Sequence, residues 1–293
     1  MVARVGREPI FAREVTRLVE RAAPGGKVAA ESLPVLQAQA LAEVVNRRLV
    51  LAYAQRTQAA PSTEEVSAEM AALLAKLERQ GKSFSDFLTA QSITEPDLRR
   101  QIVWNLVWSK YRMQYLSSSR VEAYFAAHRR ELDGSEVSVS HVLLRVGADK
   151  ESRTVEELMA RAAEIRQAVV AGKLSFAEAA RQHSAGPSAK DDGRLGFMPR
   201  HGVMDEAFSR AAFALEVGQV SGPVKTPFGV HLIRCDQIKP GAKRLADVRG
   251  EIEEALGREL LEKLAQVERQ HTPVEFTGKL PYFKPGTREL VVP

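Results

Sequence analysis

The 293-residue sequence has little cysteine, few aromatic side chains and no long apolar run. Its single cysteine, Cys235, cannot form an internal disulfide, and we interpret it as a buried thiol because it stands in a strand-like apolar run. No apolar stretch approaches the roughly 18 to 20 residues that a membrane-spanning helix needs. With 44% hydrophobic and 27% charged residues, the composition is typical of a globular protein with room for two domains.

A signal-type apolar segment is also missing from the first residues, Met1 to Pro9. We therefore expect either a cytoplasmic protein or one whose export signal is not part of this sequence. The scarcity of cysteine fits a reducing compartment, but many exported bacterial proteins also avoid cysteine. The compartment stays open at this point.

The positive charge is small and scattered along the sequence. A net charge of +5 and a pI near 9.3 suggest nucleic-acid binding. However, basic pairs such as Arg47-Arg48 and Arg99-Arg100 stand beside acidic residues, as on solvated helix faces. A surface that follows a phosphate backbone would need basic side chains gathered on one face. We therefore expect no nucleic-acid partner, and we also expect no metal and no other cofactor.

Residues 10–131 have the pattern of nearly continuous helix, with at least five helices. Residues 38–58 keep apolar side chains on one helical face until Pro61 interrupts. Ser62 with Glu65 forms a capping box, which marks the start of the next helix. Two more start signals follow, Ser83 with Asp86 and Thr94 with Asp97.

Four aromatic side chains share one face of the helix expected over residues 94–116. Their spacing of i, i+4, i+7 and i+11 forms a single stripe, made of Trp104, Trp108, Tyr111 and Tyr115. Such a stripe either packs in a core or forms an exposed groove for apolar peptide segments. Periodicity and composition do not decide between the two.

After Asp133 and Gly134 the pattern changes to strand-like alternation. Val137, Val139 and His141 fall on one face of the first expected strand. Helices are expected over residues 154–171, 175–182 and 205–214, and strands over 195–198, 220–224 and 229–238. The order β-α-α-β-α-β-β predicts a small α+β domain.

A last helix, expected over residues 245–269, has an apolar stripe and no partner of its own. Burying that stripe against the N-terminal helices would make one discontinuous helical domain with the α+β domain inserted in it. We thus expect a helical N-terminal segment over 1–133 and an α+β domain over 134–239. A C-terminal segment over 240–271 completes the helical domain, and an extended tail covers 272–293.

Ordered motifs between residues 135 and 239 resemble a parvulin-type peptidyl-prolyl isomerase domain. They are Ser140-His141-Val142-Leu143-Leu144, Phe176-Ala177-Glu178-Ala179-Ala180, Ser188-Ala189-Lys190, Gly193-Arg194-Leu195-Gly196, Gly218-Gln219-Val220-Ser221-Gly222-Pro223-Val224 and Phe228-Gly229-Val230-His231-Leu232-Ile233. The resemblance implies the FKBP-like α+β fold of parvulins and isomerisation of X-Pro bonds without covalent chemistry.

The flanking segments resemble the SurA and PrsA family of exported chaperone-isomerases. The supporting motifs are Gly6-Arg7-Glu8-Pro9-Ile10, Val45-Asn46-Arg47-Arg48-Leu49-Val50 and Val121-Glu122-Ala123-Tyr124-Phe125. This resemblance implies a chaperone domain that binds unfolded or newly exported polypeptides with X-Pro bonds. It also implies a periplasmic or cell-envelope location. It indicates neither the client set nor the oligomeric state.

The resemblance assigns a polar floor and an apolar cup to the site. His141, His231 and Thr226 would form the floor, and the two histidines of the family hydrogen-bond to each other and fix the shape of the site. The cup that receives the proline ring would consist of Leu195, Met204 and Phe208, with Phe197 or Met198 as a further wall. Without the resemblance, apolar residues in these places would be assigned to the core.

The sequence departs from the family pattern at several site positions. Gly186 stands where active parvulins have cysteine or aspartate, and Phe228 stands at a serine position of the site. Asp191 or Asp192 could supply the missing carboxylate, and Arg194 replaces an aspartate of the loop. Two hypotheses follow: an isomerase with chaperone activity, or a peptide-binding chaperone whose parvulin domain is catalytically weak.

Overall fold

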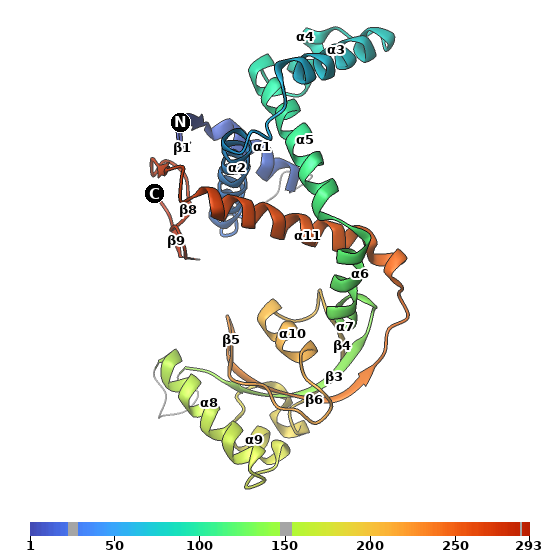
Figure 1. The fold of residues 1–293 in the computed structure, drawn as a ribbon. Helices are drawn as coiled ribbons and strands as arrows, with labels where there is room; N and C mark the ends of the chain where they lie inside the picture. The colour runs from blue at the N-terminus through green and yellow to red at the C-terminus, as the bar shows by residue number, and fades with distance from the viewer. Residues whose placement is uncertain (23–28, 147–153, 288) are drawn as a thin grey trace. The chain divides into compact units, whose positions relative to one another are not determined.

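The computed structural model describes residues 1–22, 29–146, 154–287 and 289–293. The protein forms two compact units (Figure 1). The helical unit consists of residues 1–120 and 253–293. The other unit, residues 121–252, contains the motifs that resemble a parvulin-type isomerase, and we call it the isomerase unit. The expected fold class, an α+β domain inserted between two segments of a mostly helical domain, is confirmed. No helix in the described ranges has the length and apolar character needed to cross a membrane.

The helical unit begins its helices where the sequence places its caps. Ser62, Ser83 and Thr94 each accept a hydrogen bond from the backbone N–H three residues further on. Because the first N–H groups of a helix have no partner within it, such a side chain fixes the start. The helices are α1 (Ala12–Ala22), α2 (Leu33–Arg56), α3 (Thr63–Arg79), α4 (Phe84–Ala90), α5 (Glu95–Tyr115) and most of α11 (Leu245–Glu268).

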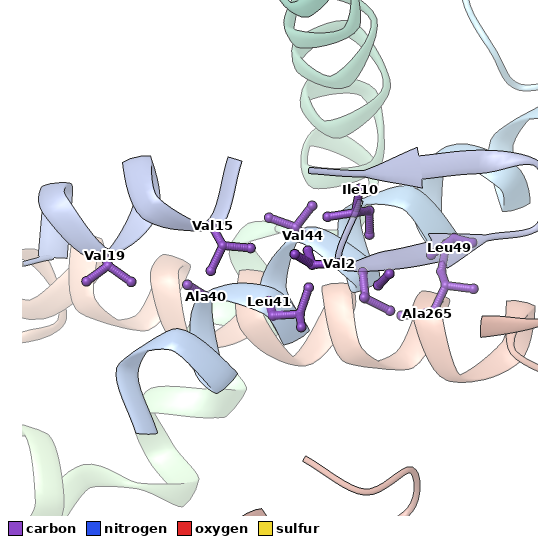
Figure 2. Packing of buried hydrophobic residues seen from close by; sticks show 12 residues of the cluster. Val2, Ile10, Val15, Val19, Ala40, Leu41, Val44, Leu49 and Ala265 are labelled. Carbon is purple, nitrogen blue, oxygen red and sulfur yellow. The ribbon is translucent and has the colours of Figure 1, made fainter. Parts of the chain in front are cut away.

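The core of the helical unit joins the two ends of the protein. Apolar side chains of α1 and α2 pack with Val2, Ile10 and, from α11, Ala265 (Figure 2). A second cluster packs Leu261 and Leu264 of α11 against α2 and α5. The apolar stripe of α11 is therefore buried in part by the N-terminal helices. Because each large aliphatic side chain contributes about 1.5–3 kcal/mol when buried, this packing holds the discontinuous unit together.

The C-terminal tail also joins this core. Its strand β7 (Val274–Phe276) pairs antiparallel with β1 (Ala3–Val5), which pairs on its other edge with β2 (Glu8–Ile10). Further on, β8 (Tyr282–Phe283) and β9 (Leu290–Val291) form a hairpin. Thus the tail, expected only to be extended, adds a strand to an N-terminal hairpin and satisfies an otherwise open edge.

The aromatic stripe of α5 lies half-buried in the helical unit. Trp104 and Tyr111 pack against the cluster that α2 and α11 form, and the rings of Trp104 and Trp108 stack with centroids 5.2 Å apart. For Trp104 and Tyr111 the structure therefore favours core packing over an exposed groove.

The isomerase unit contains a four-stranded antiparallel sheet in the order β4-β3-β6-β5. Its strands are β3 (Glu136–Leu144), β4 (Arg194–Pro199), β5 (Val224–Thr226) and β6 (Gly229–Lys239). Its helices are α7 (Arg129–Leu132), α8 (Val155–Val170), α9 (Phe176–His183), η1 (Pro187–Asp191) and α10 (Glu206–Phe213), while α6 (Ser118–Ala127) crosses the boundary between the units. The order of elements predicted from the sequence is confirmed.

The two faces of this sheet are covered by different helices (Figure 1). Val142 and Leu144 of β3 pack with α8 and α9, while Val137 and Val139 pack with α10. Because side chains alternate along a strand, His141 lies on the α10 face. Cys235 lies fully buried on that same face, and burial raises the pKa of its thiol, so its interpretation as a buried thiol is confirmed.

One predicted strand is displaced. Val220 forms only an isolated bridge, with Arg234, and the strand β5 begins at Val224, the last residue of the predicted range 220–224. Pro223 lacks the N–H that a strand donates to its neighbour, so the run cannot continue a ladder through this point.

Candidate functional site

The two histidines of the sequence motifs meet on the α10 face of the sheet. In the antiparallel pairing of β3 with β6, His141 lies opposite Ile233 and His231 lies opposite Leu143. The histidines are therefore diagonal neighbours on one face, within reach of each other's rings. Their Nδ1 atoms are 3.3 Å apart, and the residues are 7% and 5% exposed.

Each outer ring nitrogen also has a hydroxyl partner. His141 Nε2 lies 3.0 Å from Ser188 Oγ, and His231 Nε2 lies 2.8 Å from Thr226 Oγ1. The result is a four-membered hydrogen-bonded series, Ser188-His141-His231-Thr226, which we call the histidine network. Sequence reasoning missed the place of Ser188 in it, although the Ser188-Ala189-Lys190 motif already marked this serine.

The histidine network is satisfied when both imidazoles are neutral. Each neutral ring carries one N–H. One Nδ1 donates its proton to the other Nδ1. The Nε2 of the donating ring then accepts a hydrogen bond from a hydroxyl group, and the Nε2 of the other ring donates one to a hydroxyl group. Protonating both rings would place two N–H groups face to face at Nδ1. Burial lowers the pKa of both histidines, and burial with the neighbouring His141 lowers the pKa of His231 to about 4.

This lowered pKa predicts an acid-sensitive isomerase unit. In the unfolded state histidine titrates near 6.5, so the unfolded state binds the proton more readily than the folded state. The contribution of His231 to the free energy of unfolding is therefore at its maximum above about pH 6.5. It decreases by about 2–3 kcal/mol as the pH drops to 4. Urea unfolding followed by circular dichroism between pH 7 and 4.5 measures it. In His231→Gln the slope between pH 6.5 and 5 should flatten, and an equal slope in both proteins would contradict the assignment.

An apolar cluster lies directly over the imidazoles. The ring of Phe208, from α10, meets both histidines edge-on, with centroids 5.9 Å from His141 and 5.2 Å from His231. Leu195 and Met204 are partly buried against the same cluster. We call Leu195, Met204 and Phe208 the apolar cup. Phe208 is buried at its base, and Leu195 and Met204 are partly accessible to solvent.

The two further wall candidates lie in different environments. Met198 is 2% exposed and packs in the same core as Phe208, whereas Phe197 is 49% exposed. A shift in the pairing of β3 with β4 leaves Leu195 without an opposite residue, which is a β-bulge. Such a bulge re-aims a side chain, and here Leu195 packs toward the same cluster as Met198.

Arg200 fixes the loop that carries Met204. Its guanidinium donates to both carboxylate oxygens of Glu206, at 2.9 and 2.7 Å, and to Glu131 at 2.8 Å. The two carboxylates raise the pKa of this nearly buried arginine. A bidentate arginine-carboxylate pair also fixes the relative orientation of its two residues. The pair of Arg200 with Glu206 therefore holds together the two ends of the loop over residues 201–205.

The departures from the parvulin pattern have structural counterparts. A side chain at Gly186 would begin 3.2 Å from His141 Nε2, where Ser188 now supplies the polar partner. Asp192 pairs with Arg181 and Arg194, so its carboxylate is engaged away from the histidine network. Asp191 is exposed.

Phe228 lies outside the buried part of the site. The residue is 63% exposed at the turn between β5 and β6. Its backbone N–H donates to Thr226 Oγ1 at 3.1 Å, which leaves the hydroxyl proton of Thr226 available to His231 Nε2. Phe228 thus orients the histidine network through its backbone.

Ser188→Ala should weaken the isomerase unit through the histidine network. Removing the hydroxyl leaves the buried Nε2 of His141 without its partner, and the free energy of unfolding should fall by about 1–3 kcal/mol. Ser209→Ala is the matched control, because the buried Oγ of Ser209 has no hydrogen-bond partner among the described residues and its removal should cost little. Urea denaturation compares the two. A loss in Ser209→Ala as large as that in Ser188→Ala would contradict the role of Ser188.

A sheet of this order, with helices on both faces and a histidine pair beneath an apolar cup, defines the class of parvulin-type isomerase domains. The sequence comparison agrees: residues 141–237 match the family described as "Rotamase: PPIC-type PPIASE domain". This segment of the protein is a PPIC-type peptidyl-prolyl isomerase domain.

The protein is also similar to curated foldases. It is 31% identical over 166 residues to foldase protein PrsA 2 of Listeria monocytogenes, covering 56% of the present sequence and 50% of that protein. It is 39% identical over 98 residues to foldase protein PrsA of Bacillus subtilis, covering 33% and 29%. The matches thus span about half the length of such relatives or less.

One similar solved structure is the peptidylprolyl isomerase PrsA from Bacillus anthracis. It is 25% identical to the present sequence, with a TM-score of 0.35, and the match covers 78% of the present sequence and 95% of that structure.

Proposed function

We propose that this protein is a peptidyl-prolyl cis/trans isomerase that also binds unfolded polypeptides. The observation that carries the proposal is the apolar cup over the histidine network, within a domain of the PPIC-type family. In this proposal the proline ring enters between Leu195 and Met204, above Phe208, and Phe197 stands at the exposed rim. Met198 supports the cup from below.

The chemistry needs no covalent step. Rotation about an X-Pro bond loses amide resonance, which sets a barrier of about 18–20 kcal/mol and an exchange time of tens of seconds or more. A site that holds the proline ring while the preceding carbonyl turns beside polar groups binds the twisted amide better than the planar one. Such differential binding accelerates the exchange in both directions.

The histidine network acts by positioning in this mechanism. His141 and His231 are both neutral near pH 7, and their ring nitrogens are engaged with each other and with hydroxyl groups. Proton transfer is therefore not the role we assign to them. Ser188 and Thr226 hold the imidazoles in place, the backbone N–H of Phe228 orients Thr226, and the imidazoles in turn support Phe208 at the base of the cup.

The test is the isomerisation rate of a short X-Pro peptide with and without the full-length protein. An isomerase shortens the exchange, and the acceleration should scale with protein concentration. Exchange at the uncatalysed rate, together with suppressed aggregation of an unfolded client, would replace this proposal by the second hypothesis, a chaperone with a catalytically weak parvulin domain.

The helical unit, residues 1–120 and 253–293, is the proposed site of client binding. The segments expected from the sequence for this domain, 1–133 and 240–271, reach into the isomerase unit by about a dozen residues at each boundary. The names of the curated relatives, which are foldases, support polypeptide clients. A location in the cell envelope follows from the same resemblance, and cell fractionation with an antibody against the protein tests it. Recovery only with the cytoplasmic fraction would overturn that location.

A further inference from the structure

The helical unit contains a basic cavity that the proposed isomerase site does not use. The cavity has a volume of about 340 Å³ and lies among α1, α2, α5 and the turn before α5. Five arginines and two carboxylates line it, and a third carboxylate, that of Glu43 outside the lining, pairs with Arg47, which leaves an excess of two positive charges. These residues are Arg17, Arg21, Arg47, Arg48, Arg100, Glu14 and Asp97.

Both carboxylates of the cavity are already engaged. Glu14 accepts from Arg48 at 2.6 Å. Asp97 accepts from Arg100, lies 3.5 Å from Arg13, and also caps α5 by accepting the N–H of Thr94 at 3.1 Å. Arg47 pairs in addition with Glu43, so Arg17 and Arg21 are the lining arginines that have no carboxylate partner among the described residues.

Two arginines that line the cavity each have a buried donor without a partner within the described residues. The side chain of Arg48 is 9% exposed, and its Nε has no hydrogen-bond partner there. The same holds for the buried Nε of Arg47. Because a buried donor without an acceptor is costly, these N–H groups favour an incoming anionic oxygen.

A second cavity, which we call the apolar cavity because most of its lining is aliphatic, adjoins the basic one, and Glu8, Gln55 and Arg99 also line it. It has a volume of about 240 Å³ and shares Arg48, Leu51 and Arg100 with its neighbour. Its aliphatic lining includes Ala52, Val103 and Val107. A ligand that fills both cavities therefore needs an anionic group next to an apolar group.

We propose that these adjoining cavities bind a carboxylate of a polypeptide, with the neighbouring apolar side chain in the apolar cavity. The planar carboxylate matches the paired donors of a guanidinium group, and the aliphatic walls select a hydrocarbon side chain beside it. The carboxylate can belong to an acidic side chain or to the C-terminus of a polypeptide. This inference rests on the proposed client binding only in taking a polypeptide as the ligand.

The protein carries its own reporter for this site. It has two tryptophans, Trp104 and Trp108, and both lie on α5. Trp104 lines the basic cavity, and the guanidinium of Arg47 lies 5.3 Å from its ring centroid. A carboxylate that binds Arg47 should therefore change the tryptophan emission of the full-length protein.

Four short peptides test the proposal by fluorescence titration. Two are blocked at both ends and contain Leu-Asp or Leu-Asn, and two end in leucine as a free acid or an amide. We expect the acid of at least one pair to bind about tenfold more tightly than its amide, because charged hydrogen bonds are stronger than neutral ones. The pair that discriminates identifies the source of the carboxylate. Equal binding within both pairs, or no binding, overturns the proposal.

Arg17→Gln with Arg47→Gln should remove this preference for the acid. Arg48 is left intact, because its loss would strand the nearly buried Glu14, whereas Glu43, the partner of Arg47, is 42% exposed and stays hydrated without it. Arg79→Gln, on the exposed end of α3, is the matched control and should keep the preference. A preference that survives the double substitution, in a protein with unchanged thermal unfolding, overturns the proposal. Isomerisation of a neutral X-Pro peptide should be unchanged by the double substitution, which separates this outcome from failure of the proposed isomerase function.

Discussion

Gly229→Ala is expected to destabilise the isomerase unit by about 3 kcal/mol or more. The residue has a φ of +135°, which L side chains rarely adopt. An added Cβ would lie 2.2 Å from the carbonyl oxygen of Leu144, a backbone atom held in the β3–β6 pairing. The backbone strain and the clash both occur at the first residue of β6. To relieve them, the central strands β3 and β6 would have to separate there.

Gly222→Ala is the matched control for this substitution. Gly222 has an ordinary φ, and nothing lies within 4 Å of an added Cβ, so stability should change by no more than about 0.5–1 kcal/mol. Hydrogen exchange at the β3 and β6 amides measures the loss locally. Tryptophan emission reports on the helical unit through α5, and its urea midpoint should stay the same. Unchanged exchange in Gly229→Ala would show that the backbone adapts more readily than this geometry allows.

Met204→Ala is expected to lower the kcat/KM for X-Pro isomerisation by about tenfold or more. In the proposed site, Met204 and Leu195 are the partly accessible members of the apolar cup, and removal of the Met204 side chain would take away a large apolar contact with the proline ring. If that contact is tighter on the twisted amide than on the planar one, the loss falls on kcat as well as on KM. A peptide assay of cis-to-trans exchange at several substrate concentrations separates the two constants.

Val203→Ala is the control for the same loop. Val203 is 60% exposed and lies next to Met204, so it tests loop disturbance without opening the cup. Its activity should stay within about twofold of wild type, because exposed substitutions change little. An equal loss in both variants would indicate a loop effect, and no loss in either would remove Met204 from the substrate-binding side chains.

Much of the fold was predictable because its signals are local. Ser62, Thr94 and Ser175 each cap a helix through a backbone N–H three residues away, so spacing alone reveals the start. The alternation of Val137, Val139 and His141 likewise fixes which face of β3 each side chain occupies. The α+β order followed from such signals.

The candidate site was predictable only in part. Motif resemblance marked the two histidines, but their contact depends on how β3 and β6 are paired, which sets them diagonally across the sheet. A slip of one residue in that pairing would have turned one ring to the opposite face. No periodicity indicates that Ser188, 47 residues beyond His141, completes the histidine network.

Three further features were decided by the tertiary structure. Arg200 reaches back to Glu131 across 69 residues and forward to Glu206, which brackets the loop of Met204. The tail strand β7 pairs with β1 from the opposite end of the protein. The basic cavity gathers arginines from three helices, and in the sequence these looked like ordinary solvated faces.

The sequence by itself determined the helix starts, the inward faces of the strands and the family of the central domain. These features depend on spacings of two to four residues or on ordered motifs, so they are present before the protein folds. The tertiary structure alone decided the partners of the histidines, the bracket around Met204 and the cavity at Arg48. Each of these joins side chains that are distant in sequence, and their meeting depends on strand register and helix packing, which no local pattern encodes.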